Sequence, residues 1–275
     1  MKPKTAAILG AGVIGAGWAA RFALMGWDVR VFDPSPDAPG IVAAALARAR
    51  ASLPALYDLA LPEPGTVTHH ATVAETVAGA VWIQESVPER LEMKHALLAE
   101  VQAAADPEAI LASSTSGFTP TELQQGAADP VRILVAHPFN PVYLLPLVEL
   151  VASPATDPAL IPRAETILRG IGMAPLPVRG EIPAHIADRF LEAVWREALW
   201  LIRDDIATTG EIDDAIRLGF GLRWAQMGLF ETYRIAGGAG GMTQFLDQFG
   251  PALKWPWTKL MDVPDLDADL VAKIA

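Results

Sequence analysis

A glycine-rich turn near the N-terminus constrains the fold more than any other feature of the sequence. Gly10, Gly12 and Gly15 follow the short apolar run Ala6–Leu9 and precede an apolar segment, 18–25, with helical spacing. In a strand-turn-helix unit the first glycine permits the tight turn, the second lets the backbone approach a pyrophosphate, and the third allows close packing of helix on strand. The free N–H groups at the helix N-terminus then bind the phosphates. We therefore predict that a dinucleotide is bound by the whole turn: Gly10, Ala11, Gly12, Val13, Ile14 and Gly15.

An acidic residue indicates which dinucleotide the turn binds. A second apolar run, Val29–Phe32, ends at Asp33, eighteen residues after Gly15. A carboxylate at that point accepts hydrogen bonds from the ribose 2′-hydroxyl of NAD and repels the 2′-phosphate of NADP. The sequence therefore predicts NAD as the cofactor. The alternative is a glycine turn that holds no ligand.

Short β-branched runs alternate with alanine-rich helical segments as far as about residue 179, which is typical of parallel βαβ units. Beyond Pro183, which is placed to open a helix, only helical periodicity remains. The predicted fold class is α/β, with an N-terminal Rossmann-type, doubly wound, mostly parallel sheet in residues 1–180 and an all-helical C-terminal domain in residues 181–275. Proline-rich sequence before Gly180 marks the boundary. The expected strands are Thr5–Leu9, Val29–Phe32, Val67–His70, Val81–Gln84, Ile110–Ser113, Arg132–Ala136, Leu147–Val151 and Leu176–Val178.

The composition excludes several classes of protein. With 32 acidic residues against 21 lysines and arginines, the net charge is −11, so the mean field repels nucleic acid and anionic membranes. The chain has no cysteine, which rules out disulfides and thiolate ligands, and its five histidines form no array spaced for a metal. No uncharged segment approaches the roughly 18 to 20 residues that a membrane helix needs. We therefore expect a cytoplasmic protein without a metal centre.

One histidine and one carboxylate stand in the otherwise apolar segment 132–151, in which two predicted strands flank a proline-rich bend. His137 and Glu149 are equidistant from the centre of that bend, near Tyr143, so we expect them to be cross-strand neighbours. A buried carboxylate beside an imidazole fixes its tautomer and stabilises its protonated form, which makes histidine a usable general base near neutral pH. The alternative is a purely structural hydrogen bond.

Together these motifs resemble the NAD-dependent L-3-hydroxyacyl-CoA dehydrogenase family over nearly the whole chain. The resemblance rests on the glycine turn with its acidic residue, the run Ser113–Ser116, the run His137–Pro141 with Glu149 twelve residues after its histidine, and the segment Ala187–Arg189. It implies the oxidation of a 3-hydroxyl group with NAD, and a homodimer formed through the helical domain. Members of the family usually extend some tens of residues beyond the position of Ala275, so truncation of this domain is one interpretation.

The family resemblance also implies roles for individual residues. His137 would accept the proton of the substrate hydroxyl, Glu149 would pair with His137, and Ser116 would hydrogen-bond the reacting oxygen. Glu85 and Arg90 would lie beside the nicotinamide, although the family commonly has lysine where Arg90 stands.

Two departures from the family pattern bear on the substrate. The acyl-CoA members carry a lysine-rich helical segment after the second strand, but Asp37–Leu61 contains only Arg48 and Arg50 as cations, which offers little to the phosphates of CoA. Asp188 stands where those enzymes place asparagine. An ionised aspartate only accepts hydrogen bonds and adds negative charge, so it favours a cationic ligand.

The runs Gly219–Gly238 and Leu253–Lys259 resemble those of the carnitine-oxidising members of the family. Carnitine is a zwitterionic 3-hydroxy acid whose trimethylammonium group donates no N–H hydrogen bond, so it is recognised by aromatic ring faces and negative charge. Arg223 is a candidate partner for the substrate carboxylate, and the alternative for each ring is core packing. The candidate rings are Tyr143, Phe190, Trp195, Trp224 and Tyr233.

Other functions stay open from the sequence. The same chemistry could act on another small 3-hydroxy acid, such as L-gulonate or 3-hydroxybutyrate, or on a 3-hydroxyacyl-CoA. A different class is an NAD-binding protein without turnover, against which the presence of Ser116, His137 and Glu149 argues.

Overall fold

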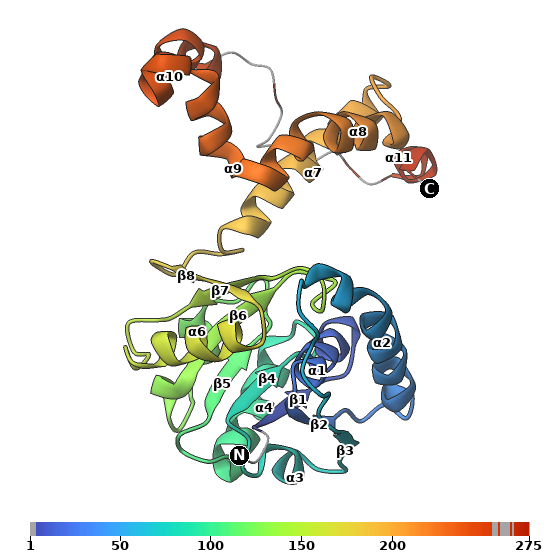
Figure 1. Cartoon of the computed structure of the whole chain (residues 1–275), viewed down its shortest axis with the longest axis vertical. Coiled ribbons are helices and arrows are strands. Elements are labelled where there is room, and N and C mark those ends of the chain that lie inside the picture. The colour runs from blue at the N-terminus through green and yellow to red at the C-terminus, as the bar shows by residue number, and fades with distance from the viewer. Residues whose placement is uncertain (1–3, 255–257, 259–264, 266, 275) are drawn as a thin grey trace. The chain divides into compact units, whose positions relative to one another are not determined.

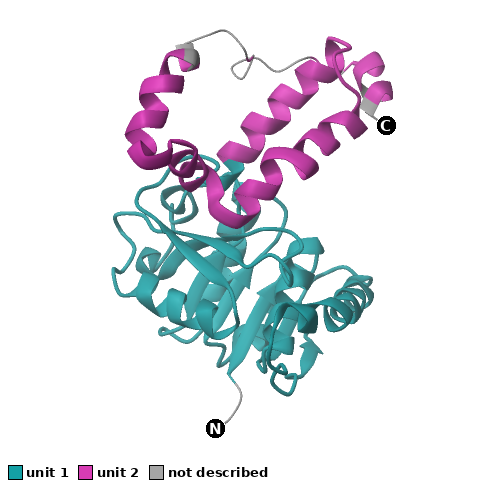
Figure 2. Cartoon of the chain, turned by 45° about the horizontal axis from the view of Figure 1, so that its top comes forward, with its two compact units in different colours: residues 1–188 teal, residues 189–275 magenta. Residues whose placement is uncertain are grey.

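The computed structural model describes residues 4–254, 258, 265 and 267–274. The chain divides into two units, Met1–Asp188 and Arg189–Ala275 (Figure 2). The first unit therefore continues past the boundary expected near Gly180. It does so because the segment after β8 is hydrogen-bonded to it: the carboxylate of Glu181 accepts from the backbone N–H and the hydroxyl of Thr121, both at 2.6 Å.

The first unit contains one sheet of eight strands in the order β3-β2-β1-β4-β5-β6-β7-β8 (Figure 1). Strand β1 pairs in parallel with both β2 and β4, which is the doubly wound arrangement. The chain reverses direction only between β6 and β7, and β8 is parallel to β7. The predicted doubly wound, mostly parallel sheet is thus confirmed. The strands are β1 (Thr5–Leu9), β2 (Asp28–Phe32), β3 (Val67–His69), β4 (Trp82–Glu85), β5 (Ile110–Ser113), β6 (Ile133–Pro138), β7 (Leu147–Val151) and β8 (Ala174–Val178).

Two apolar cores lie on opposite faces of this sheet. Along β1, Ala6 and Ile8 pack into one core and Ala7 and Leu9 into the other, because side chains alternate along a strand. Helices α1, α2 and α6 contribute buried side chains to the first core, and α3, α4 and α5 to the second. A strand covered on both faces needs apolar residues throughout, which explains the continuous apolar runs in the sequence. The helices are α1 (Val13–Leu24), α2 (Ala38–Ser52), α3 (Val73–Val77), α4 (Leu91–Ala104), α5 (Pro120–Leu123) and α6 (Leu160–Gly170).

All eight predicted strands are present, and the main differences are at their ends. Strand β6 extends to Pro138 instead of ending at Ala136, because its pairing with β7 continues as far as Pro138 opposite Val148. His137 consequently lies inside a strand and not in the bend that follows it.

The described part of the second unit is helical, as predicted. The prediction that Pro183 opens the first of these helices was wrong, since α7 begins at Ala187. Ala184 and His185 have left-handed backbone angles, with φ of 60° and 48°, which a helix cannot contain. No helix within the described residues is long and apolar enough to cross a membrane. The helices are α7 (Ala187–Arg203), α8 (Thr209–Ala215), α9 (Gly221–Ala236), α10 (Gly241–Phe249) and α11 (Ala268–Ile274).

A buried arginine on α1 binds segments next to β6 and β8 on the same face of the sheet. The guanidinium group of Arg21 donates to the carbonyl oxygens of Ile171 at 2.7 Å, of Tyr143 at 3.2 Å and of Gly172, and to the hydroxyl of Tyr57 at 2.5 Å. Burial lowers the pKa of Arg21, while Tyr57 acts in the opposite direction. These hydrogen bonds hold the bend after β6 and the turn before β8 against α1.

We expect Arg21→Met to lower the free energy of unfolding by about 3 kcal/mol, because three carbonyl groups, one buried and two half-buried, lose their donor. Chemical denaturation monitored by tryptophan fluorescence measures the change. The control is Arg169→Met, which removes only an exposed ion pair with Glu165 and should cost less than about 0.5 kcal/mol. Equal effects of the two substitutions would contradict a structural role for Arg21.

Candidate active site

The three glycines of the turn between β1 and α1 meet different steric demands. Gly10 has a φ of 91°, and a Cβ there would lie 2.6 Å from the carbonyl oxygen of Ser86. A Cβ on Gly15 would lie 1.8 Å from the carbonyl oxygen of Gly10. Gly12, the N-cap of α1, has nothing within 4 Å of the position of a Cβ. Two glycines thus let the backbone pack closely, and the third leaves space at the N-terminus of the helix.

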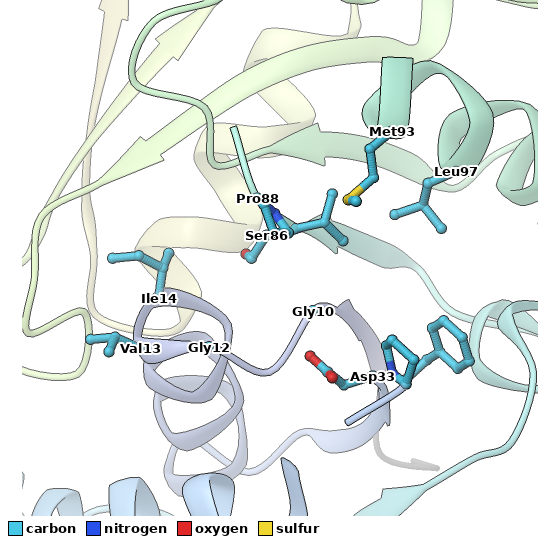
Figure 3. Close-up of a pocket in the computed structure, with 12 residues that line it drawn as sticks. Gly10, Gly12, Val13, Ile14, Asp33, Ser86, Pro88, Met93 and Leu97 are labelled. Carbon is cyan, nitrogen blue, oxygen red and sulfur yellow. The ribbon is translucent and has the colours of Figure 1, made fainter. Parts of the chain in front are cut away.

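That space belongs to a cavity of about 650 Å³, which Figure 3 shows with the glycine turn and Asp33 on one side and Met93 and Leu97 on the other. The Asp33 carboxylate accepts the N–H of Ala11 at 2.6 Å and the N–H of Ser35 at 2.8 Å, which fixes it beside the turn. The cavity is lined by Gly10, Gly12, Val13, Ile14, Phe32, Asp33, Pro34, Ser86, Val87, Pro88, Met93 and Leu97.

These residues fit NAD. The open side of Gly12 and the free N–H groups at the start of α1 suit a pyrophosphate, and Asp33 at the end of β2 suits the hydroxyls of a ribose. The apolar side chains of Met93 and Leu97 offer a surface to a flat base. The sequence identified the turn and the carboxylate, and it missed the α4 residues because apolar side chains on a helix are usually core.

A buried ion pair lies where β4 ends. Lys94 Nζ is 2.9 Å and 3.1 Å from the two carboxylate oxygens of Glu85, and both side chains are almost completely buried. Ser113, at the end of β5, also donates to Glu85. Arg90, which the family resemblance implies lies beside the nicotinamide, is exposed at the N-cap of α4. The buried cation is Lys94, one helical turn later, and the sequence reasoning missed it.

Glu89 extends this network toward the loop after β5. Its carboxylate accepts hydrogen bonds from the hydroxyl of Thr115 and from the N–H of Gly117 at 3.0 Å. It also forms an ion pair with Lys94 at 3.1 Å. Burial alone would raise the pKa of Glu89, but these donors outweigh burial and lower it. The loop that carries Ser116 is therefore held at both flanking residues. Ser116 itself is exposed.

His137 and Glu149 are paired across β6 and β7, as the sequence predicted. They are opposite each other in the antiparallel register, and His137 Nδ1 lies 3.0 Å from Glu149 Oε2. A carboxylate only accepts, so Nδ1 carries the hydrogen and Nε2 is left as the proton acceptor of the neutral ring. His137 is 4 % exposed and Glu149 fully buried.

The second oxygen of Glu149 is bound by the start of α7. Oε1 accepts the N–H groups of Ile186 at 2.9 Å and Ala187 at 3.0 Å. Burial acts to raise the pKa of Glu149, but the hydrogen bonds from His137, Ala187 and Ile186 more than offset burial and lower it. Glu149 is therefore ionised at neutral pH.

A second carboxylate faces the other nitrogen of the imidazole. Asp188 Oδ2 lies 3.5 Å from His137 Nε2, and the Asp188 side chain is 21 % exposed. The rings of Phe139 and His185 flank His137, with centroids 5.2 Å and 5.3 Å away. The sequence predicted a substrate-binding role for Asp188, which lies beside His137. It gave no role to His185, because a histidine before a helix carries no specific signal.

The other candidate substrate residues are divided between the two units. Tyr143 packs against the core on the α1 side of the sheet. Phe190, Trp195 and Arg223 are exposed residues of the second unit.

Two further candidate rings, also in the second unit, contact other aromatic side chains. Trp224 contacts Phe220, with ring centroids 4.7 Å apart, and Tyr233 stacks on Phe245 at 4.6 Å. Most of the run Leu253–Lys259, including Trp255 and Trp257, lies outside the described residues.

The arrangement can bind a dinucleotide at the ends of β1 and β2 and hold a proton acceptor at the end of β6. All three strands are parallel, so their C-terminal ends meet at one edge of the sheet, where ligands of doubly wound folds bind. Ser116 follows β5 at the same edge. Within the described residues no group of three or more histidine, aspartate or glutamate side chains could hold a metal ion.

Comparison with known proteins finds close relatives. The chain is 65 % identical over 271 residues to an L-carnitine dehydrogenase/betainyl-CoA thioesterase of Ruegeria pomeroyi, covering 98 % of this chain and 56 % of that protein. It is 55 % identical to an L-carnitine dehydrogenase of Mesorhizobium japonicum, covering 98 % of this chain and 74 % of the relative. The chain thus spans about half the length of the Ruegeria relative, whose name includes a second activity.

Among solved structures, the NAD+-dependent 5-formyl-3-hydroxy-2-methylpyridine 4-carboxylic acid 5-dehydrogenase is similar with a TM-score of 0.84 and 27 % identity, covering 98 % of this chain and 86 % of that one. Mycobacterium tuberculosis FadB2 shares the fold, with a TM-score of 0.71.

Family models match both units. Residues 5–182 match the NAD binding domain of 3-hydroxyacyl-CoA dehydrogenase, and residues 185–265 match its C-terminal domain. The first match confirms NAD as the predicted cofactor. The sequence, the sheet topology and these matches agree: the chain belongs to the 3-hydroxyacyl-CoA dehydrogenase family.

Proposed function

We propose that this chain oxidises the 3-hydroxyl group of L-carnitine to 3-dehydrocarnitine with NAD. The observation that carries the proposal is the buried His137–Glu149 pair, which lies at the edge of the sheet where the dinucleotide cavity lies. The second imidazole nitrogen, His137 Nε2, faces the carboxylate of Asp188. The names of the similar proteins support carnitine as the substrate.

In the proposed reaction the neutral His137 imidazole removes the hydroxyl proton through Nε2. The glycine turn and Asp33 would hold NAD, which would supply the acceptor for the hydride from C3, so the products would be NADH, 3-dehydrocarnitine and a proton held by His137. Ser116 donates a hydrogen bond to the reacting oxygen. Glu149 holds Nδ1–H and stabilises the imidazolium that forms.

Asp188 supports a cationic substrate. Only one methylene separates the C3 carbinol of carnitine from its ammonium nitrogen, so a carboxylate beside the acceptor nitrogen of His137 also lies beside the ammonium group. The methyl groups of that cation leave it no N–H donor, and its recognition therefore depends on charge and on ring faces. We propose Arg223 as the partner of the substrate carboxylate. We propose that the rings are drawn from Tyr143, Phe190, Trp195, Trp224 and Tyr233.

We further infer that the chain forms a homodimer through its helical unit. Helix α7 exposes Phe190, Leu191 and Trp195, each more than half exposed in the single chain, and α9 exposes Phe230 at 72 %. Large apolar side chains at such exposure are typical of a surface that is covered in an assembly.

The substrate assignment is tested by the initial rate of NADH formation with L-carnitine, L-gulonate, 3-hydroxybutyrate and 3-hydroxybutyryl-CoA. We expect kcat/KM for carnitine to exceed the others by at least about 100-fold, because only carnitine places a cation beside Asp188. A preference for the CoA ester would overturn the substrate assignment, and no NADH from any of the four would overturn the activity.

His137→Gln should lower kcat by about 10²- to 10⁴-fold, because the general base is lost while the dinucleotide site is unchanged. Stopped-flow or steady-state rates measure kcat, and fluorescence titration measures the NAD dissociation constant, which should stay at its wild-type value. The matched control is His95→Gln, whose ring bonds the carbonyl of Glu122 on α5. Wild-type turnover in the His137 variant would remove it from the mechanism.

Asp188→Asn should lower kcat/KM for carnitine by at least about tenfold and leave that for 3-hydroxybutyrate unchanged or raised, since only carnitine loses an attractive charge. Parallel assays of both substrates give the ratio. Asp58→Asn makes the same charge change at an exposed site and serves as the control. An equal fall for both substrates would mean that Asp188 does not discriminate by charge.

A further inference from the structure

A second histidine, His185, lies beside the His137–Glu149 pair, and none of the reaction steps described above uses it. The side chain of His185 is fully buried, and its ring centroid lies 5.3 Å from that of His137. His185 belongs to the segment between β8 and α7. A buried imidazole needs polar partners, and among the residues that the structure describes only one of its two nitrogens has one.

That one partner fixes the tautomer of neutral His185. Nε2 lies 3.2 Å from the carbonyl oxygen of Thr115, and a carbonyl only accepts, so Nε2 carries the hydrogen and Nδ1 has a bare lone pair. Burial lowers the pKa of His185, and His137 lowers it further, while the Thr115 carbonyl and the charges of Glu149 and Asp188 act to raise it. Because the net shift is downward, His185 is neutral at neutral pH.

The backbone at this position is strained. Ala184 and His185 both have left-handed φ values, 60° and 48°, which residues with a Cβ disfavour. Such a turn persists only where the surroundings hold it. Its consequence is that the next two N–H groups, of Ile186 and Ala187, point at Glu149 Oε1.

We propose that neutral His185 is a positioning residue for the oxidation of the substrate hydroxyl. Its Nε2–H holds the Thr115 carbonyl, and with it the loop that carries Ser116, to the strained turn whose N–H groups bind Glu149. The side chain of His185 thus fixes the position of Ser116 relative to the His137–Glu149 pair. This inference rests on the proposed function, in which both parts act on one hydroxyl group.

Protonation of His185 at low pH should disable this arrangement, independently of any effect of pH on the general base. A proton on His185 Nδ1 adds a positive charge beside His137, which must itself accept a proton during the reaction. The charged groups that face His185 are His137, Glu149 and Asp188, and Glu149 is already hydrogen-bonded to His137. The acid limb of the pH–rate profile should therefore contain an ionisation of His185.

Two substitutions separate the hydrogen bond from the bulk of the ring. His185→Phe keeps a ring of similar size without a donor, and His185→Gln keeps an N–H donor near the position of Nε2 without titrating. We expect kcat with carnitine to fall by about 10- to 100-fold in the Phe variant, and to stay within about threefold of wild type in the Gln variant. On the acid side, log kcat/KM should fall more steeply in wild type than in the Gln variant, because only wild type has the ionisation of His185.

Thermal denaturation should show one cooperative transition in each variant, and the NAD dissociation constant should match wild type, which shows that each variant is folded. The inference is overturned if the Phe variant keeps the wild-type kcat and acid limb, or if the Gln variant falls as far as the Phe variant.

Nitrogen NMR of labelled imidazole rings tests the tautomer without any turnover. The His185 signals, assigned by their loss in His185→Gln, should report a protonated Nε2 and a bare Nδ1 at neutral pH. A charged ring or a protonated Nδ1 would overturn the inference. Failure of wild type to oxidise carnitine would overturn the proposed function instead, and the two failures are therefore distinguishable.

Discussion

The ionised carboxylate of Glu149 is the constraint on which the rest of the site depends. It is fully buried, and a buried charge is tolerated only when donors surround it. The donors come from His137 on β6 and from two backbone N–H groups at the start of α7. One carboxylate on β7 therefore fixes the tautomer of an imidazole and the position of the turn that follows β8.

The sheet topology brings this carboxylate to the edge where the dinucleotide cavity lies. Strands β1, β2, β4, β5 and β6 are parallel, so the glycine turn, the loop after β5 and the end of β6 occupy one edge. The reversal between β6 and β7 then places Glu149 opposite His137. A wholly parallel sheet would not bring together two residues only twelve positions apart in this way, because a parallel connection needs a crossover.

Much of this could be predicted from the sequence, because the signals are local. Short segments contain the steric demands that indicate the glycine turn and Asp33. The strands follow from the alternation of short apolar runs with helical segments. The His137–Glu149 pairing followed from symmetry about a proline-rich bend. What could not be predicted depends on distant contacts: Lys94 resembles any solvated helix lysine until Glu85 is seen beside it, and no residue preference predicts two left-handed residues before α7. The prediction that Pro183 opens a helix was wrong for the same reason, since α7 begins at Ala187.

The central claim is that His137 Nε2 faces the hydroxyl group of a substrate held beside the nicotinamide. A crystal structure of the chain with NADH and L-carnitine, a pair that cannot react, tests it most directly. The account predicts the carnitine hydroxyl oxygen at about 3 Å from His137 Nε2, with C3 facing the nicotinamide ring. Carnitine bound with its hydroxyl away from His137, or with the nicotinamide on the opposite side of the sheet, would contradict it.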